Sequence, residues 1–374
     1  MGAHVKAKSR LVLSGINFFE GGPLSLMRDC LSYLENSCYG HSHDIIALVS
    51  EVKFYIDLNL KNITLFEYPS SRRSYFKRLY YEYFVFKKFA RENKIHFWIS
   101  MHDITPSLAG IPQAVYCHNP APFYNPSLRE FFFEPSLGLF SYFYKFIYRT
   151  NIHRNNYVIV QQEWLRDSFC KLYSVSKQKI IVAHPSINIT PEKENKRNGK
   201  VKVFVYPTLS RVFKNVELIG EAVIVLNKRG IENYKVVITI DGTENRYSQW
   251  LRKKFRDLPN LHFIGKQSRD KVFDLYYQAD CLIFPSKLET WGMPISEFKA
   301  TGKYILLADL PYAHETLGDY TKSCFFNPMS KIDLANKMGS LILEKPFTYN
   351  HESKIIEYPF AHDWQELFKI LLAS

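Results

Sequence analysis

The 374-residue chain lacks the features that mark several common protein classes. No run of residues is long and apolar enough to cross a bilayer, so we expect no transmembrane helix. The apolar run at residues 11–13 is interrupted too soon by polar residues and glycines to predict a signal peptide. The chain also has no Walker lysine loop, no GxGxxG and no zinc-ligand spacing. These absences exclude the usual ATPases, dehydrogenases and zinc enzymes.

The cysteines show no paired or metal-binding spacing, and several stand in apolar runs. The six are Cys30, Cys38, Cys117, Cys170, Cys281 and Cys324. Unpaired cysteines of this kind are typical of reduced, mostly buried thiols. Because disulfides are rare in the cytosol, the pattern predicts a cytoplasmic protein.

Positive charge is in excess, with a formal net charge of +13. Nucleic acid, an anionic membrane surface and anionic substrates are all compatible with that value. Residues 72–94 hold eight Lys/Arg and eight aromatics, and residues 123–148 hold eleven Phe and Tyr. Basic-aromatic segments suit an interfacial helix, so we expect contact with an anionic membrane surface. The alternative is that the rings belong to the core and the cations to a solvated face.

Apolar runs alternate with helical patterns along the chain, which predicts parallel strands joined by crossover helices. The pattern restarts after a polar, charged stretch that offers nothing to a core. We therefore expect an N-terminal domain at 1–192, a linker at 193–200, a C-terminal domain at 201–355 and a last helical segment at 356–374.

The segment 284–302 carries the most information. An apolar strand ends at Phe284, a turn carries Glu289, and Gly292 and Pro294 open a helix that contains Glu297. Both carboxylates can face one cleft. The free N–H groups at the helix start attract phosphate. A diphosphate beside two carboxylates that hold sugar hydroxyls describes a nucleotide-sugar site.

This segment resembles the signature of the retaining glycosyltransferases of family 4, in which two glutamates stand eight positions apart. The resemblance implies the GT-B fold: two Rossmann-like domains that face each other across a cleft, with the last helix crossing back to the first domain. It also implies that Glu297 accepts hydrogen bonds from the donor ribose and that Glu289 holds sugar hydroxyls. The remaining donor contacts implied for this domain are backbone groups at Trp291, Gly292 and Met293 and, around the nucleobase, at Ile264.

In the first domain the resemblance places Gly21 and Gly22 beside the donor diphosphate. It places His118, which follows a predicted strand, near the transferred sugar. His102 follows another strand and is the rival for that contact. We favour His118 because its sequence context is more similar to that of the family.

The loop 207–215 corresponds to the family's phosphate-binding loop. Lys214 matches the lysine that neutralises the departing diphosphate. The family's arginine stands five positions before that lysine, where this chain has Leu209. Arg211 stands three positions before Lys214, and whether its side chain contacts the phosphates stays open.

The chain contains no Asp-x-Asp, the metal-binding motif of the other major glycosyltransferase fold. We therefore expect no metal and no cofactor, with positive potential supplied by Lys214, Arg211 and the helix start. The expected function is retaining, metal-independent transfer of a mannose-like or similar hexose from a GDP- or UDP-linked donor. The expected acceptor is a glycan or lipid-linked glycan in surface polysaccharide or lipopolysaccharide (O-antigen) synthesis at the cytoplasmic face of the inner membrane.

Three alternatives stay open. A nucleotide-sugar epimerase of related fold would convert the donor without an acceptor. An inactive scaffold would bind the donor without turnover. A nucleic-acid-binding protein is suggested by charge alone, but no recognisable RNA or DNA module is present, so we expect no nucleic-acid partner.

Overall fold

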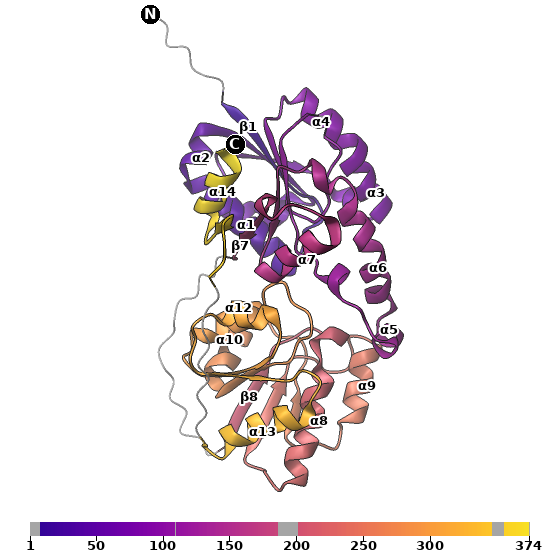
Figure 1. The fold of residues 1–374 in the computed structure, drawn as a ribbon, viewed down its shortest axis with the longest axis vertical. Helices are drawn as coiled ribbons and strands as arrows, with labels where there is room; N and C mark the ends of the chain where they lie inside the picture. Colours follow the sequence, from indigo (N-terminus) through magenta and orange to yellow (C-terminus); the bar gives the residue numbers. More distant parts are fainter. Residues whose placement is uncertain (1–7, 109, 186–200, 346–354, 374) are drawn as a thin grey trace, which may run out of the picture. The chain divides into compact units, whose positions relative to one another are not determined.

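The computed structural model describes residues 8–108, 110–185, 201–345 and 355–373. The chain divides into two compact units (Figure 1). The first contains residues 1–122, 142–186 and 356–374, and the second contains residues 123–141 and 187–355. Each unit is built around its own parallel sheet.

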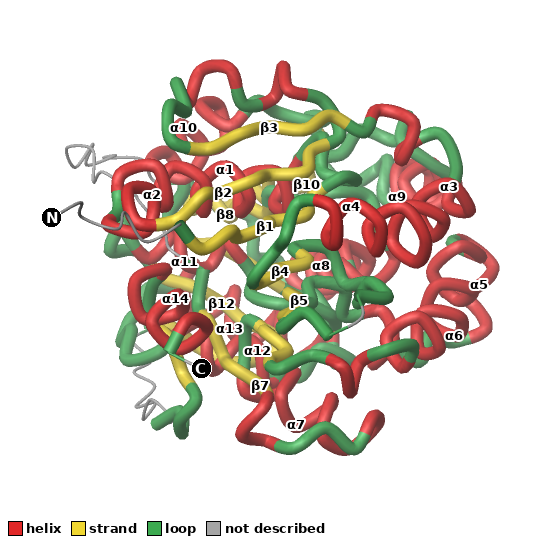
Figure 2. The backbone as a smooth tube through the Cα atoms, turned by 90° about the horizontal axis from the view of Figure 1, so that it is seen from above, coloured by secondary structure: helices red, strands yellow, loops and turns green. Residues whose placement is uncertain are grey.

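The first unit holds an eight-stranded sheet in the order β14-β7-β6-β5-β4-β1-β2-β3. Every neighbouring pair is parallel, and Figure 2 shows β3, β2, β1, β4 and β5 side by side in that sequence. The strands are β1 (Ser9–Gly15), β2 (His43–Val49), β3 (Ile63–Glu67), β4 (Phe97–Ser100), β5 (Gln113–Tyr116), β6 (Tyr157–Val160), β7 (Ile180–Ala183) and β14 (Phe360–Ala361). Except in the edge strand β3, their central residues are buried and mostly apolar, as a sheet covered on both faces requires.

The helices of this unit follow the predicted crossover pattern. They are α1 (Gly21–Asn36), α2 (Cys38–Ser42), α3 (Tyr75–Tyr80), α4 (Phe86–Glu92), α7 (Glu163–Tyr173) and α14 (Trp364–Leu372). A π-helical turn, Tyr81–Val85, joins α3 to α4. The long helix α6 (Pro135–Arg149) begins in the second unit and ends in the first.

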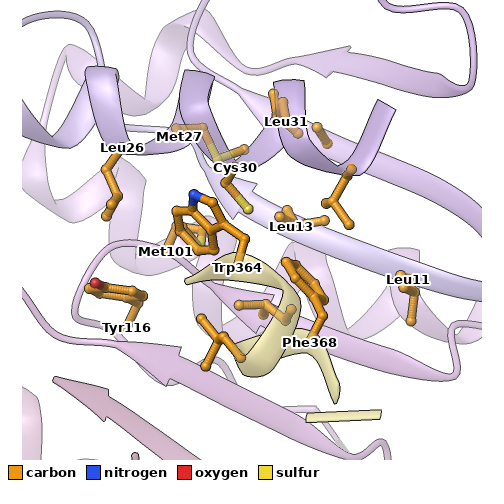
Figure 3. Close-up of a cluster of buried hydrophobic side chains, with 14 of the residues drawn as sticks. Leu11, Leu13, Leu26, Met27, Cys30, Leu31, Met101, Tyr116, Trp364 and Phe368 are labelled. Atoms are coloured by element: carbon orange, nitrogen blue, oxygen red, sulfur yellow. The ribbon is translucent and has the colours of Figure 1, made fainter. Parts of the chain in front are cut away.

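The last helix, α14, belongs to the core of the first unit. Its apolar face buries Trp364, Phe368 and their neighbours Leu367 and Leu371. Figure 3 shows Trp364 and Phe368 among side chains of β1 and α1, including Leu13. Fully burying one such side chain stabilises a fold by about 1.5–3 kcal/mol. The prediction that the last helix crosses back to the first domain is confirmed.

The second unit holds a six-stranded parallel sheet in the order β10-β9-β8-β11-β12-β13. Its strands are β8 (Lys202–Tyr206), β9 (Tyr234–Ile238), β10 (Leu261–Phe263), β11 (Cys281–Phe284), β12 (Tyr304–Ala308) and β13 (Ser323–Phe326). Its helices are α5 (Leu128–Phe133), α8 (Val216–Lys228), α9 (Arg246–Lys254), α10 (Arg269–Gln278), α11 (Met293–Lys299), α12 (Pro311–Leu317) and α13 (Lys331–Ile342). The two parallel sheets confirm the prediction of two Rossmann-like domains.

Each sheet has one point at which the strand order reverses: between β4 and β1 in the first, and between β8 and β11 in the second. Ligands of open parallel sheets bind beyond the carboxyl ends of the strands at such points. The topology therefore singles out the loops that follow these four strands.

The segment 123–141 leaves the first unit and packs with the second. Arg129 of α5 lies 2.9 Å from Glu217, and Lys287 lies 3.0 Å from Glu130. The sequence-based domain 1–192 contains this segment without a break, because contacts so distant in sequence leave no local pattern. The expected linker 193–200 lies outside the described residues. None of the helices described is long and apolar enough to cross a membrane.

Candidate nucleotide-sugar site

The central feature of the second unit is an ion pair between Lys214 and Glu289. Lys214 follows β8 and Glu289 follows β11, and these strands are parallel neighbours at the switch point. Lys214 Nζ lies 2.5 Å from Glu289 Oε1, and both side chains are largely shielded from solvent. Sheet topology thus brings together two predicted site residues that are 75 positions apart.

Backbone and side-chain hydrogen bonds fix these two loops to each other. The Lys287 N–H donates to the Phe213 carbonyl at 2.7 Å. Asn215, in the left-handed region with φ 56°, donates through Nδ2 to the Pro285 carbonyl at 3.2 Å. The Tyr206 hydroxyl donates to the Lys214 carbonyl at 3.0 Å. The Lys214–Glu289 pair is therefore held on a rigid support, as a binding site needs.

Glu297 lies in α11, the helix that follows the Glu289 loop. It is buried, accepts a hydrogen bond from the Tyr276 hydroxyl at 3.0 Å and lies 3.3 Å from Arg269 Nη2. Burial and the nearby Glu297 carboxylate raise the pKa of Tyr276 well above its ordinary value, so the phenol remains a donor. The carboxylate is oriented by these two donors before any ligand arrives.

Gly292 caps the start of α11 with φ +86°, a conformation that side chains rarely adopt. A Cβ added there would stand 3.0 Å from the Ile295 side chain. Trp291 is buried and donates through Nε1 to Ser296 Oγ at 3.0 Å, and Met293 is the first residue of the helix. The glycine thus allows the chain to turn directly from the Glu289 loop into α11.

Ile264 directly follows β10 and is partly exposed. Its N–H donates to the Ile238 carbonyl at 3.0 Å. The next residue, Gly265, has φ +75°, and a Cβ there would meet Asp241 Oδ2 at 2.7 Å. The backbone at this edge of the sheet is thus fixed in place.

Arg211 makes an ion pair with Glu134, the residue that ends α5. The second oxygen of Glu134 accepts from the Val212 N–H at 3.2 Å. The guanidinium also lies over the Phe213 ring, 5.3 Å from its centroid. Sequence reasoning missed Glu134, because nothing local indicates that the segment 123–141 reaches this loop.

In the first unit, Gly21 and Gly22 begin α1 after the β1 loop. Both are exposed, and a Cβ at either would meet nothing within 4 Å. The left-handed backbone of Gly21, with φ +67°, accounts for a glycine at that position.

His118 follows β5 and is half-buried. Its ring stacks on Tyr116 with 4.9 Å between centroids, and Nε2 contacts the Met101 carbonyl. The backbone N–H of His118 donates to Asp103 Oδ1 at 2.7 Å. Burial lowers the pKa of His118, although the Asp103 carboxylate acts in the opposite direction. The imidazole is therefore neutral near pH 7.

The rival histidine, His102, is fully buried. Arg78 Nη2 lies 3.0 Å from its Nδ1, and a guanidinium can only donate, so Nδ1 must accept. The ring proton then lies on Nε2, which stands 3.0 Å from Glu82 Oε1. Residues already present occupy both ring nitrogens, so in this conformation His102 orients Arg78. The Arg78 and Glu82 contacts have no local sequence signal, because they reach from α3 and the π-helical turn to the β4 loop.

The predicted site residues thus fall into two groups. Lys214, Glu289 and Glu297 lie with Arg211 and Ile264 at the carboxyl edge of the second sheet. Gly21, Gly22 and His118 follow strands of the first sheet and belong to the other unit. Among the described residues, no group of three or more His, Cys, Asp or Glu could hold a metal ion.

Comparison with known proteins gives a family match for part of the chain. Residues 186–359 match the model of the glycosyl transferases group 1 family. The O-antigen chain mannosyltransferase RfbU of Salmonella typhimurium is 26% identical over 210 residues, which are 55% of this chain and 54% of that protein. The chain thus aligns with about half the length of this curated relative.

Solved structures are similar over nearly the whole chain. A glycosyltransferase from Rickettsia africae has a TM-score of 0.65 at 15% identity, covering 91% of this chain and 89% of its own. Anabaena HepE in complex with UDP-glucose has a TM-score of 0.63 at 16% identity, covering 90% of each chain. At such identities the likeness concerns the fold. The chain therefore has the GT-B fold, and its residues 186–359 match the model of the glycosyl transferases group 1 family.

Proposed function

We propose that the chain is a retaining, family 4-type glycosyltransferase that moves a hexose from a nucleotide-sugar donor to a saccharide acceptor in surface polysaccharide synthesis. The observation that carries this proposal is the Lys214–Glu289 pair at the switch point of the second sheet, with Glu297 preoriented on the next helix. The O-antigen role of the Salmonella relative supports the type of product.

In the proposed reaction Glu297 accepts hydrogen bonds from the donor ribose, and backbone groups near Ile264 flank the base. Lys214 moves from Glu289 towards the diphosphate, which frees the Glu289 carboxylate for hydroxyls of the sugar. Arg211 adds a second positive charge after it leaves Glu134. Backbone groups at 291–293 and the glycines at 21 and 22 complete the donor contacts.

The bond between the anomeric carbon and the phosphate oxygen breaks, and the electron pair leaves with the nucleoside diphosphate. Lys214 then stabilises a charge that is larger in the transition state than in the bound donor, which is the requirement for catalysis. The acceptor hydroxyl attacks from the leaving-group face and gives its proton to a phosphate oxygen. His118, neutral because of its burial, contacts the transferred sugar from the first unit.

An assay of nucleoside diphosphate release tests this proposal. GDP- and UDP-linked hexoses are supplied with and without a lipid-linked saccharide, and the product's anomeric configuration is read by NMR. We expect release that depends on the acceptor and a product that keeps the donor's configuration. Donor conversion without acceptor indicates the epimerase, and donor binding without turnover indicates the scaffold. Binding to random oligonucleotides without any donor binding indicates a nucleic-acid function.

Activity is expected to survive EDTA. Lys214 and Arg211 supply the positive charge at the diphosphate that a divalent ion supplies elsewhere. The measurement is the initial rate after EDTA treatment and after later addition of Mn²⁺ or Mg²⁺. Complete loss of activity on chelation, reversed by the metal, would contradict the proposal.

Glu134→Gln is expected to lower the KM for the donor by up to about fivefold, because half-exposed ion pairs are worth up to about 1 kcal/mol and this one competes for Arg211. The amide oxygen of Gln still accepts from the Val212 N–H. Glu130→Gln on the same segment is the control, since Glu130 pairs with Lys287 and not with Arg211. An unchanged KM in Glu134→Gln would show that Arg211 does not reach the donor.

Peripheral membrane association, at the cytoplasmic face of the inner membrane, is a further part of the proposal. In the 72–94 segment Arg78 and Phe86 are buried, whereas Phe76, Tyr80 and Phe84 are exposed. Helix α6 is a second candidate for the contact. One of its faces exposes a run of large apolar side chains: Leu139, Phe140, Tyr142, Phe143 and Phe146.

The triple variant Phe140→Ser, Phe143→Ser, Phe146→Ser is expected to reduce binding to anionic liposomes at least about tenfold, because each buried ring contributes more than about 1 kcal/mol. Co-sedimentation across a salt series measures it, and binding should also weaken as salt rises. A triple variant that binds like the native protein would exclude this face of α6 as the contact.

A further inference from the structure

A cavity of about 500 Å³ opens in the first unit at the carboxyl edge of its sheet. Asn17 and Phe19 of the loop after β1 form one side, and residues 69, 71–75 and 78, which follow β3, form the other. β1 stands at the switch point of this sheet, where ligands are expected.

The cavity lining is strongly basic. It includes Arg72, Arg73 and Arg78, and none of the described residues that line it carries a carboxylate. Arg72 lies over the Phe19 ring at 4.1 Å and pairs with Glu51, which also contacts Lys53. Arg73 is exposed and makes no ion pair with the residues described. The positive charge of the lining is therefore only partly neutralised.

Arg78 is the buried arginine of this lining, with 7% of its surface exposed. Its Nη2 donates to the His102 carbonyl at 2.6 Å and to His102 Nδ1 at 3.0 Å, so the guanidinium is held in one orientation. Its Nε–H is buried without a hydrogen-bond partner in the described structure, and so is Asn17 Oδ1. Rotation of the Asn17 amide would present its two N–H donors instead. Buried donors without partners in a basic cavity are suited to the oxygens of an anion.

An exposed aromatic stripe follows this cavity in sequence, on α3 and the π-helical turn that continues it. Phe76, Tyr80 and Phe84 stand four residues apart and are 83%, 58% and 66% exposed. The rings of Tyr80 and Phe84 stack at 5.7 Å, so these two residues share a face. Tyr75, at the cavity, begins this helix. The first unit therefore offers the arginines of the cavity to an anionic group and, on the stretch of helix that follows, exposed rings to an apolar chain.

We propose that this cavity binds the phosphate or diphosphate of a lipid-linked acceptor, with the first part of the lipid chain on Phe76, Tyr80 and Phe84. The inference rests on the proposed glycosyltransferase function, and it names the part of the acceptor that the first unit recognises. Arg73 and Arg72 contact the outer phosphate oxygens, and the Arg78 Nε–H donates a hydrogen bond to the innermost phosphate oxygen. The saccharide beyond the phosphate is then held at the carboxyl edge of the sheet, where His118 also lies.

Binding measured without any nucleotide sugar tests this site independently of turnover. The probes are farnesyl diphosphate, inorganic pyrophosphate, farnesol and phosphatidylglycerol vesicles. We expect farnesyl diphosphate to bind the native protein at least about tenfold more tightly than pyrophosphate, because only it can also bury apolar surface on the rings. Farnesol should bind weakly.

Arg73→Gln is expected to weaken the binding of both diphosphate probes by about tenfold, which corresponds to the loss of one charge-assisted hydrogen bond. Arg73→Lys should recover part of that loss. Lys77→Gln is the matched control: Lys77 is an exposed cation of α3 that does not line the cavity. The double variant Phe76→Ser, Phe84→Ser should weaken the binding of farnesyl diphosphate and leave the binding of pyrophosphate unchanged. Arg78 is not substituted, because it holds His102 inside the core.

Equal losses in Arg73→Gln and Lys77→Gln would overturn the proposal, since they indicate diffuse surface charge. So would a loss of vesicle binding in Arg73→Gln with diphosphate binding intact, which indicates a lipid headgroup surface. A loss of nucleoside diphosphate binding in Arg73→Gln would assign the cavity to the donor instead. Tight, Arg73-dependent binding of farnesyl diphosphate by a protein that transfers no sugar would support the cavity and contradict the proposed function.

Discussion

Glu297→Ala is expected to lower kcat/KM for the nucleotide-sugar donor by about 10²–10⁴-fold. Two charge-assisted hydrogen bonds to the ribose are lost, and each is worth about 1.5–3 kcal/mol. Most of the loss should appear in donor affinity, because the ribose is held similarly in the bound donor and in the transition state. Titration of the donor and steady-state kinetics measure the two contributions separately.

A structural role for Glu297 must be distinguished from this one, since the residue is buried and bonded to Tyr276. Tyr276→Phe removes the same internal hydrogen bond but keeps the carboxylate. We expect Tyr276→Phe to lower the melting temperature and to retain most donor affinity. If Tyr276→Phe and Glu297→Ala lose donor affinity equally, or if Glu297→Ala keeps native rates, Glu297 is not a donor ligand.

Lys214→Ala is expected to lower kcat by about 10²–10³-fold, the usual cost of removing one preorganised group that stabilises developing charge. Donor affinity should fall less than kcat, since the charge on the leaving diphosphate grows as the glycosidic bond breaks. Single-turnover measurements at saturating donor isolate this step. Lys214→Arg keeps the charge and should recover part of the rate.

Loss of Lys214 also leaves Glu289 without its partner, and an unpaired, largely buried carboxylate destabilises a fold. Lys254→Ala is the matched control, because Lys254 pairs with Glu217 and Glu221 on the helices of the same unit. It should alter stability without altering kcat. A kcat for Lys214→Ala within about threefold of native would remove Lys214 from the chemical step.

The part of the site carried by continuous sequence was predictable. A buried strand, a turn with Glu289, and Gly292 before α11 are local signals, and the structure has each of them at the expected place. The pairing of Lys214 with Glu289 also follows once β8 and β11 are recognised as parallel strands, because neighbouring strands bring their following loops together. For these residues, local pattern and topology were sufficient.

Other features depend on contacts between distant segments. Glu134 reaches Arg211 only because the segment 123–141 packs with the second unit. His102 looked like a loop residue but is buried, because Arg78 from α3 and Glu82 from the π-helical turn cover it. The basic-aromatic composition of residues 72–94 could not separate buried rings from exposed ones, since the π-helical turn shifts the helical phase between α3 and α4. A sequence pattern predicts which face of a helix or strand is apolar, but not which other element covers that face.

Calorimetric titration of GDP and UDP into the native protein, Glu297→Ala and Lys214→Ala tests the central claim most directly, namely that the carboxyl edge of the second sheet binds a nucleoside diphosphate. We predict that one of the two nucleotides binds the native protein with one site per chain. Each variant should weaken the binding of that nucleotide by at least about tenfold, a loss of about 1.4 kcal/mol in binding free energy. Failure of both nucleotides to bind, or binding that neither substitution changes, would contradict the account.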